Sequence, residues 1–156
     1  MNRPSRLFPR PRPTRRSPYR SIVVALDGSA AAEHALPPAI ALARASGAAI
    51  HLVHVEARVL PFHAAPLRVA DTSPRHPHTD AYLAGLRDRI AQREKVPVLA
   101  AMIGGPVLGG LLGYAARVGA GLIVMTTHGR AGPHATRLGT IAGLMAAQSS
   151  IPVLFI

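Results

Sequence analysis

The chain of 156 residues contains no cysteine. This absence excludes disulfide bonds, thiol nucleophiles and thiolate metal sites, and it is compatible with a reducing cytosol. The apolar stretches are far shorter than the roughly 20 residues of a membrane-spanning helix. Only 4% of the residues are aromatic although 49% are hydrophobic, so the core must consist of alanine, valine, leucine and isoleucine. We therefore expect a single soluble, cytoplasmic domain that does not contact a membrane.

Acidic residues are few: seven stand against 18 Lys and Arg, and the net charge is +11. Residues 1–20 hold seven of the arginines, repeated prolines and no acid. Such a segment cannot bury enough apolar surface to fold, which predicts a disordered arm at 1–20 and a folded domain at 21–156. An arm of this kind can bind nucleic acid, but it is more often a solvated extension, and we favour the extension.

Short runs of β-branched and other apolar residues recur along the rest of the chain. They show no polar alternation, which is typical of strands covered on both faces. The stretches between them are long enough for crossover helices. This pattern predicts an α/β fold, namely an open, doubly wound, five-stranded parallel sheet of the Rossmann-like type with helices on both faces. The expected strands are 22–26, 50–55, 98–103, 122–125 and 153–156.

The first helix is expected over 30–46, with Gly47 as its stop and with Asp27 or Ser29 as the cap of its first amides. Pro37 and Pro38 remove two amide donors, so they predict a kink or a late start. The other helices are expected over 79–94, 107–118 and 138–148. A long surface loop is expected over 57–78.

Three glycines weaken the helix expected at 107–118, since each costs up to about 1 kcal/mol relative to alanine. They are Gly109, Gly110 and Gly113. We attribute all three to a close approach of this helix to the sheet rather than to a mobile lid.

In an open parallel sheet, ligands bind beyond the carboxyl ends of the strands, where the strand order reverses. Two segments are expected to meet there: 25–29, at the exit of the first strand, and 126–132, which follows the fourth and leads to the helix at 138–148. The second segment offers glycines, amides at a helix start, the hydroxyl of Thr140 and the positive charge of Arg130. These features suit either a phosphate site or a simple chain turn, and no P-loop triplet is present.

Several motifs, taken in order, resemble the universal stress protein family. They are IVVALDGS at 22–29, HLVHV at 51–55, GLIVMTTHGRAG at 121–132 and the closing IPVLFI. The nucleotide signature of that family is Gly, two residues, Gly, nine residues, Gly, then Ser or Thr. Here it reads Thr126, two residues, Gly129, nine residues, Gly139-Thr140. The resemblance implies an adenine-nucleotide α-hydrolase-like fold, bound ATP with or without Mg²⁺, and a role as a stress-response regulator.

The resemblance also implies where the nucleotide contacts this chain. Asp27 and the backbone of Val55 would contact the adenine side, and the phosphates would lie against the loop and helix start near Gly139. Thr126 departs from the glycine that many ATP-binding members carry near the ribose, and it could crowd the pocket. The complete predicted set is Ala25, Leu26, Asp27, Val55, Thr126, His128, Gly129, Arg130, Gly139, Thr140 and Ile141.

Catalysis and metal binding are weaker hypotheses. His128 has no nucleophile or orienting carboxylate beside it in the sequence, so we expect binding and at most very slow ATP hydrolysis. His63, His76 and His78 lack the spacing of a helical metal pair, and we expect no metal site.

An alternative function from another class is a dimeric interaction module that binds no nucleotide. Its basic arm at 1–20 would then bind an anionic partner. In either case the final strand, 153–156, can lie at the edge of the sheet. Pairing with the same strand of a second subunit would cover that edge, and the family resemblance also implies such homodimers.

Overall fold

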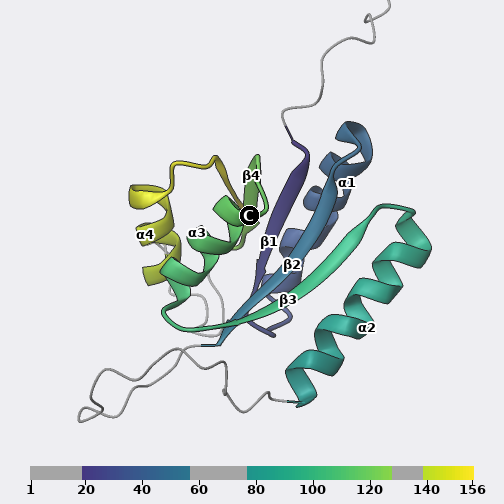
Figure 1. Ribbon diagram of the computed structural model, residues 1–156, viewed down its shortest axis with the longest axis horizontal. Coiled ribbons are helices and arrows are strands. Elements are labelled where there is room, and N and C mark those ends of the chain that lie inside the picture. Colours follow the sequence, from purple (N-terminus) through teal and green to yellow (C-terminus); the bar gives the residue numbers. More distant parts are fainter. Residues whose placement is uncertain (1–18, 57–76, 128–138) are drawn as a thin grey trace, which may run out of the picture.

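The computed structural model describes residues 19–56, 77–127 and 139–156. Five strands alternate with helices along these residues, as the sequence predicts (Figure 1). The elements are β1 (Ser21–Leu26), the 3₁₀ helix η1 (Ala32–Ala35), α1 (Leu36–Ser46), β2 (Ala49–Glu56), α2 (Pro77–Glu94), β3 (Val98–Gly104), α3 (Val107–Arg117), β4 (Leu122–Met125), α4 (Thr140–Gln148) and β5 (Val153–Phe155).

All five strands form one parallel sheet in the order β3-β2-β1-β4-β5. β1 lies at the centre, where Val24 pairs with Leu52 of β2 on one side and with Val124 of β4 on the other. The order reverses between β1 and β4, because β2 and β3 lie to one side of β1 while β4 and β5 lie to the other. The five-stranded parallel sheet is therefore confirmed.

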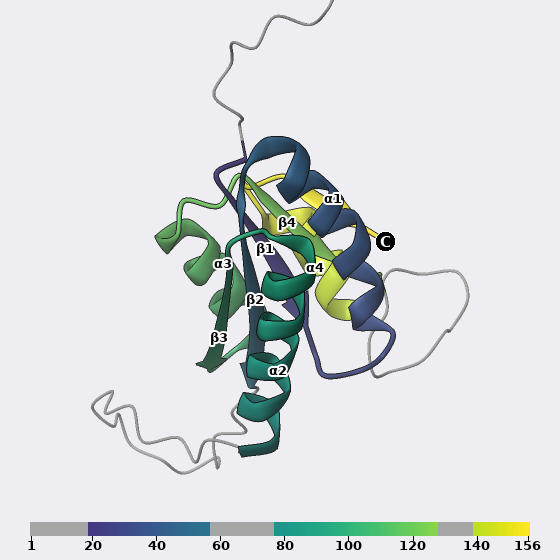
Figure 2. The same cartoon turned by 90° about the vertical axis from the view of Figure 1, so that its right-hand side faces the viewer.

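Helices cover both faces of the sheet (Figure 2). Ile22 and Val24 of β1 are fully buried against a core that includes α1 and α2. Val23 points to the opposite face and is fully buried in a second core that includes α3 and α4. Since successive strand residues alternate between faces, a continuous apolar strand supplies both cores. The prediction of a doubly wound fold is confirmed.

The two prolines delay the first helix as the sequence predicts. η1 occupies the residues just before them, and α1 begins at Leu36 with proline in its first positions, where a missing amide costs little. Gly47 ends α1 in the left-handed region, at φ +71°, and its amide donates to the carbonyl of Ala43 at 2.8 Å.

Some boundaries differ from the expected ones. α2 begins at Pro77 rather than at residue 79, and α4 begins at Thr140 rather than at residue 138. Tyr19, assigned from sequence to the arm, packs against the core beside α1 and α2. The rest of that arm and most of the expected loop at 57–78 lie outside the described residues, so both stay predictions. No helix within the described ranges is long and apolar enough to cross a membrane.

The explanation offered for the α3 glycines is right at one position and wrong at two. A Cβ added at Gly110 would lie 3.0 Å from Cγ1 of Val55 in β2, so the helix does approach the sheet closely there. A Cβ added at Gly109 or at Gly113 would meet nothing within 4 Å. These two glycines lie on the exposed side of α3, and close packing does not account for them.

One titratable side chain is buried in the core under α3. His51 of β2 is only 7% exposed, and its Nδ1 lies 3.0 Å from the hydroxyl of Tyr114. The guanidinium of Arg117 lies 4.8 Å from the centre of the Tyr114 ring, so a cation already faces the pair. Burial lowers the pKa of His51 below its ordinary value, because a charged imidazole is poorly solvated there. The fold therefore favours neutral His51.

This burial predicts a loss of stability in mild acid. The unfolded chain takes up the His51 proton near pH 6.5, whereas the folded chain takes it up only at lower pH. The contribution of His51 should thus be constant above that pH and should fall below it, by at most about 1.4 kcal/mol per pH unit until the folded pKa is reached. Urea unfolding of the wild type and of His51→Gln across this range checks it. Glutamine can still contact Tyr114 but does not titrate, so an equally steep pH dependence in both proteins would contradict the prediction.

Candidate functional site

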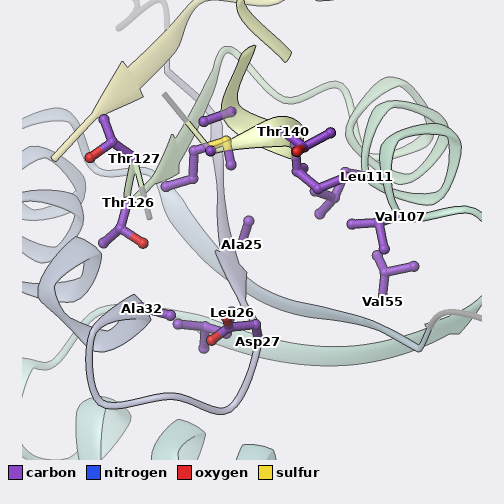
Figure 3. A pocket seen from close by; sticks show the side chains of 14 residues that line it. Ala25, Leu26, Asp27, Ala32, Val55, Val107, Leu111, Thr126, Thr127 and Thr140 are labelled. Carbon is purple, nitrogen blue, oxygen red and sulfur yellow. The ribbon is translucent and has the colours of Figure 1, made fainter. Parts of the chain in front are cut away.

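A cavity of about 320 Å³ opens at the carboxyl ends of the central strands, where the strand order reverses (Figure 3). Its walls come from β1, β2 and β4, from the short helix η1, and from α3 and α4. The lining residues are Ala25, Leu26, Asp27, Ala32, Val55, Val107, Leu111, Met125, Thr126, Thr127, Gly139, Thr140, Ile141 and Ala142.

The exit of β1 forms a tight polar turn at one end of this cavity. Oδ1 of Asp27 accepts hydrogen bonds from the amide of Ser29 at 2.9 Å and from its hydroxyl at 2.6 Å. The same hydroxyl accepts a hydrogen bond from the amide of Ala32, the first residue of η1, at 3.2 Å, although the N-cap residue of that helix is Ala31. Gly28 adopts φ +80°, a conformation that glycine enters without strain. The carboxylate of Asp27 is thereby held in place beside the cavity.

The exit of β4 and the start of α4 are joined by backbone hydrogen bonds. The amide of Gly139 donates to the carbonyl of Thr127 at 2.9 Å, although eleven residues separate them in the sequence. The amide of Thr127 donates in turn to the carbonyl of Ile156, which follows β5. These bonds place the N-terminus of α4 next to the ends of β4 and β5.

The first turn of α4 presents backbone amides to the cavity. Gly139 is the N-cap residue, no side chain caps the helix, and its first turn contains no acid. Thr140, Ile141 and Ala142 follow in the cavity wall, and the first amides of a helix have no partner within the helix. Together with the helix dipole, such amides favour a negatively charged group.

The opposite wall is apolar. Val55 of β2 lies next to Val107 of α3, and Leu111 follows one turn further along the helix (Figure 3). Leu111 and Met125 are nearly fully buried, at 3% and 7% exposed. A wall of this kind suits a flat apolar ring and offers it no charged partner.

Most of the predicted residues meet in this one cavity. Eight of them line it: Ala25, Leu26, Asp27, Val55, Thr126, Gly139, Thr140 and Ile141. His128, Gly129 and Arg130 lie outside the described residues. The part that each plays in binding stays a prediction.

Sequence reasoning missed six lining residues. Two of them, Val107 and Leu111, belong to α3, and their spacing of four residues puts them on one helical face. That spacing was visible in the sequence, but it indicated only packing on the sheet. The others are Ala32, Met125, Thr127 and Ala142, of which Met125, Thr127 and Ala142 directly adjoin a predicted position.

The parts of the chain that the structure describes contain no group of three His, Cys, Asp or Glu side chains that could hold a metal ion. His78 is exposed near the start of α2, whereas His63 and His76 lie outside the described residues.

Comparisons with known proteins give a consistent result. A model of the universal stress protein family matches residues 18–156. A solved universal stress protein in complex with cAMP is 23% identical, with a TM-score of 0.66 over 88% of this chain and 96% of that one. A member of the family from Burkholderia pseudomallei is 28% identical, with a TM-score of 0.62 over 90% and 97%. UspA from Lactobacillus plantarum is 20% identical, with a TM-score of 0.63 over 88% and 97%. A comparison with curated proteins gave no significant match.

Proposed function

The chain belongs to the universal stress protein family, and we propose that it binds an adenine nucleotide in the cavity between the ends of β1 and β4. The ligand that we propose is ATP, with or without Mg²⁺, in a protein that acts as a stress-response regulator. One observation carries this proposal: residues predicted from four separate stretches of the sequence line a single cavity at the switch point of the sheet.

The two ends of the cavity match the two ends of a nucleotide. Adenine would lie against the apolar wall of Val55 and Val107, within reach of the carboxylate of Asp27, which can accept a hydrogen bond from its amino group. The phosphates would lie at the start of α4, near Gly139 and Thr140, where backbone amides favour an anion. The predicted contacts of His128, Gly129 and Arg130 would add to this end.

The lining residues also bear on the choice between binding and hydrolysis. Asp27 is the one acid among the residues that line the described cavity, and its Oδ1 already accepts two hydrogen bonds from Ser29. It lies at the adenine end, away from Thr140 (Figure 3). A magnesium ion would therefore be held by the phosphates and by water, which is common for this ion. We propose binding rather than catalysis.

The structure of a universal stress protein in complex with cAMP supports the ligand class, since cAMP is itself an adenine nucleotide. A homodimer through the C-terminal strand belongs to the same proposal. β5 is one of the two edge strands of the sheet, and Ile156, which directly follows it, is 42% exposed. Such an edge is commonly covered by a second copy.

The proposal predicts that the protein carries its ligand through purification. The full chain is purified without added nucleotide and denatured, and the supernatant is analysed by chromatography and mass spectrometry. We expect adenine nucleotide in a near-stoichiometric amount. In addition, ATP at about 100 times its Kd should raise the free energy of unfolding by about 2.7 kcal/mol, because only the folded state binds it.

Two controls make the result decisive. GTP at the same concentration should stabilise the protein much less, and the last wash before denaturation should contain no nucleotide. A chain that releases no nucleotide and gives no heat on titration with ATP, ADP, AMP or cAMP would refute the proposal. Attention would then move to the alternative of a dimeric interaction module.

A further inference from the structure

α3 approaches the sheet closely at Gly110, next to the cavity wall. A Cβ built on Gly110 would lie 3.0 Å from Cγ1 of Val55 and 3.4 Å from its Cγ2. It would also lie 3.6 Å from Cγ2 of Ile103, which pairs with Val55 in the neighbouring strand. Gly110 thus rests on the side chain of a residue that lines the candidate nucleotide site.

The backbone beneath this contact is firmly held. Val55 pairs with Ile103 and Glu56 pairs with Gly104 in the parallel ladder of β2 and β3. The amide of Gly105 donates to the carbonyl of Glu56 at 3.0 Å, which extends the pairing past the end of the strand. If a side chain were added at Gly110, the strand could not move away easily, so the side chain of Val55 or the helix itself would have to move.

Either movement would change the cavity. Val55 lines the cavity, so any displacement of its side chain by a methyl group at Gly110 changes the shape of that wall. If α3 moved instead, it would carry Val107 and Leu111, which line the same wall (Figure 3). No comparable coupling exists at the other two glycines of α3, since a Cβ added at Gly109 or Gly113 meets nothing within 4 Å.

We infer that Gly110 is a positioning residue, which sets the width of the adenine end of the pocket through its contact with Val55. The inference rests on the proposed function, and it assigns this task to a residue that does not itself line the cavity. The absence of a side chain at position 110 allows Val55 to pack directly against α3. Any larger residue there would displace the wall formed by Val55 or by α3, against which the adenine would lie.

The test compares three single variants by calorimetric titration with ATP and by urea unfolding. Gly110→Ala should weaken ATP binding about three- to tenfold, the range that corresponds to forcing one side chain out of its preferred rotamer. Gly109→Ala and Gly113→Ala make the same chemical change in the same helix, where it meets open space. Both should raise the urea midpoint, because alanine favours helix, and both should leave the affinity for ATP unchanged.

A double variant separates this coupling from a general loss of packing. Val55→Ala removes both methyl groups that approach Gly110, so Gly110→Ala should have little effect on ATP affinity in that background. An affinity unchanged by Gly110→Ala in a chain that binds ATP would overturn this inference and leave the proposed function standing. So would an equal loss of affinity in the Gly109→Ala or Gly113→Ala variant, or an undiminished loss in the double variant. A wild-type chain that binds no adenine nucleotide would overturn both.

Discussion

Replacing Gly139 by tryptophan will abolish nucleotide binding, with an affinity at least about 100-fold weaker than that of the wild type. Gly139 contributes only backbone to the cavity wall, at the start of α4 where the phosphates are proposed to lie. An indole at this position would occupy the part of the cavity, about 320 Å³ in all, in which the phosphates are proposed to lie. Calorimetric titration with ATP and analysis of the released nucleotide measure the loss.

The protein should nevertheless fold. Gly139 adopts φ −56° and ψ 156°, which is extended backbone open to any residue, so tryptophan brings no backbone strain. A matched control is Gly143→Trp on the same helix, because a Cβ added there meets nothing within 4 Å. It should leave ATP binding within about twofold of the wild type, as a surface change away from the ligand does. A Gly139→Trp variant that has a native circular dichroism spectrum and binds ATP normally would show that the phosphates do not lie at α4.

The strands and their burial could be predicted from the sequence because each run of apolar residues is short and unbroken. Ile22, Val23 and Val24 are all fully buried, which is possible only when a strand is covered on both faces. Pro37 and Pro38 likewise gave a correct prediction, since the loss of their amides acts locally. The predicted boundaries were less accurate for elements whose start depends on tertiary contacts. The start of α4, for example, follows a hydrogen bond from Gly139 to Thr127 across eleven intervening residues.

The cavity was predictable where it is built from strand ends and less so where a helix closes it. Ala25 lies near the end of β1 and Asp27 directly follows that strand, so the topology alone places them at the switch point. Val107 and Leu111 reach the cavity only because α3 crosses back over β2, and that crossing is set by packing across the sheet. The same reason explains the α3 glycines. Only the three-dimensional structure distinguishes Gly110, which touches Val55, from Gly109 and Gly113.

Replacing Asp27 by alanine will weaken ATP binding about 10- to 100-fold, the range of a hydrogen bond to a charged group. A carboxylate accepts several hydrogen bonds, so in the proposed complex Asp27 accepts one from the amino group of adenine in addition to those from Ser29. Guanine carries a carbonyl oxygen at the corresponding position, and two acceptors repel each other. The wild type should therefore prefer ATP to GTP, and Asp27→Ala should lose most of that preference. Calorimetric titration with both nucleotides gives the ratio of affinities.

Two further variants test whether the carboxylate of Asp27 itself recognises the adenine base. Ser29→Ala removes one of the donors to Oδ1 and the acceptor of the Ala32 amide but keeps the carboxylate, so it should weaken ATP binding by no more than about threefold, in keeping with the loss of one neutral hydrogen bond. In Asp27→Asn, the two donors of Ser29 should hold the amide oxygen in the place of Oδ1 and leave the amino group toward the base. The site would then offer a donor where it offered an acceptor, and the preference should move toward GTP. If Asp27→Ala binds ATP as tightly as the wild type and still rejects GTP, the adenine must be recognised elsewhere in the cavity. The Asp27 turn would then serve only to hold Ser29 against the start of η1.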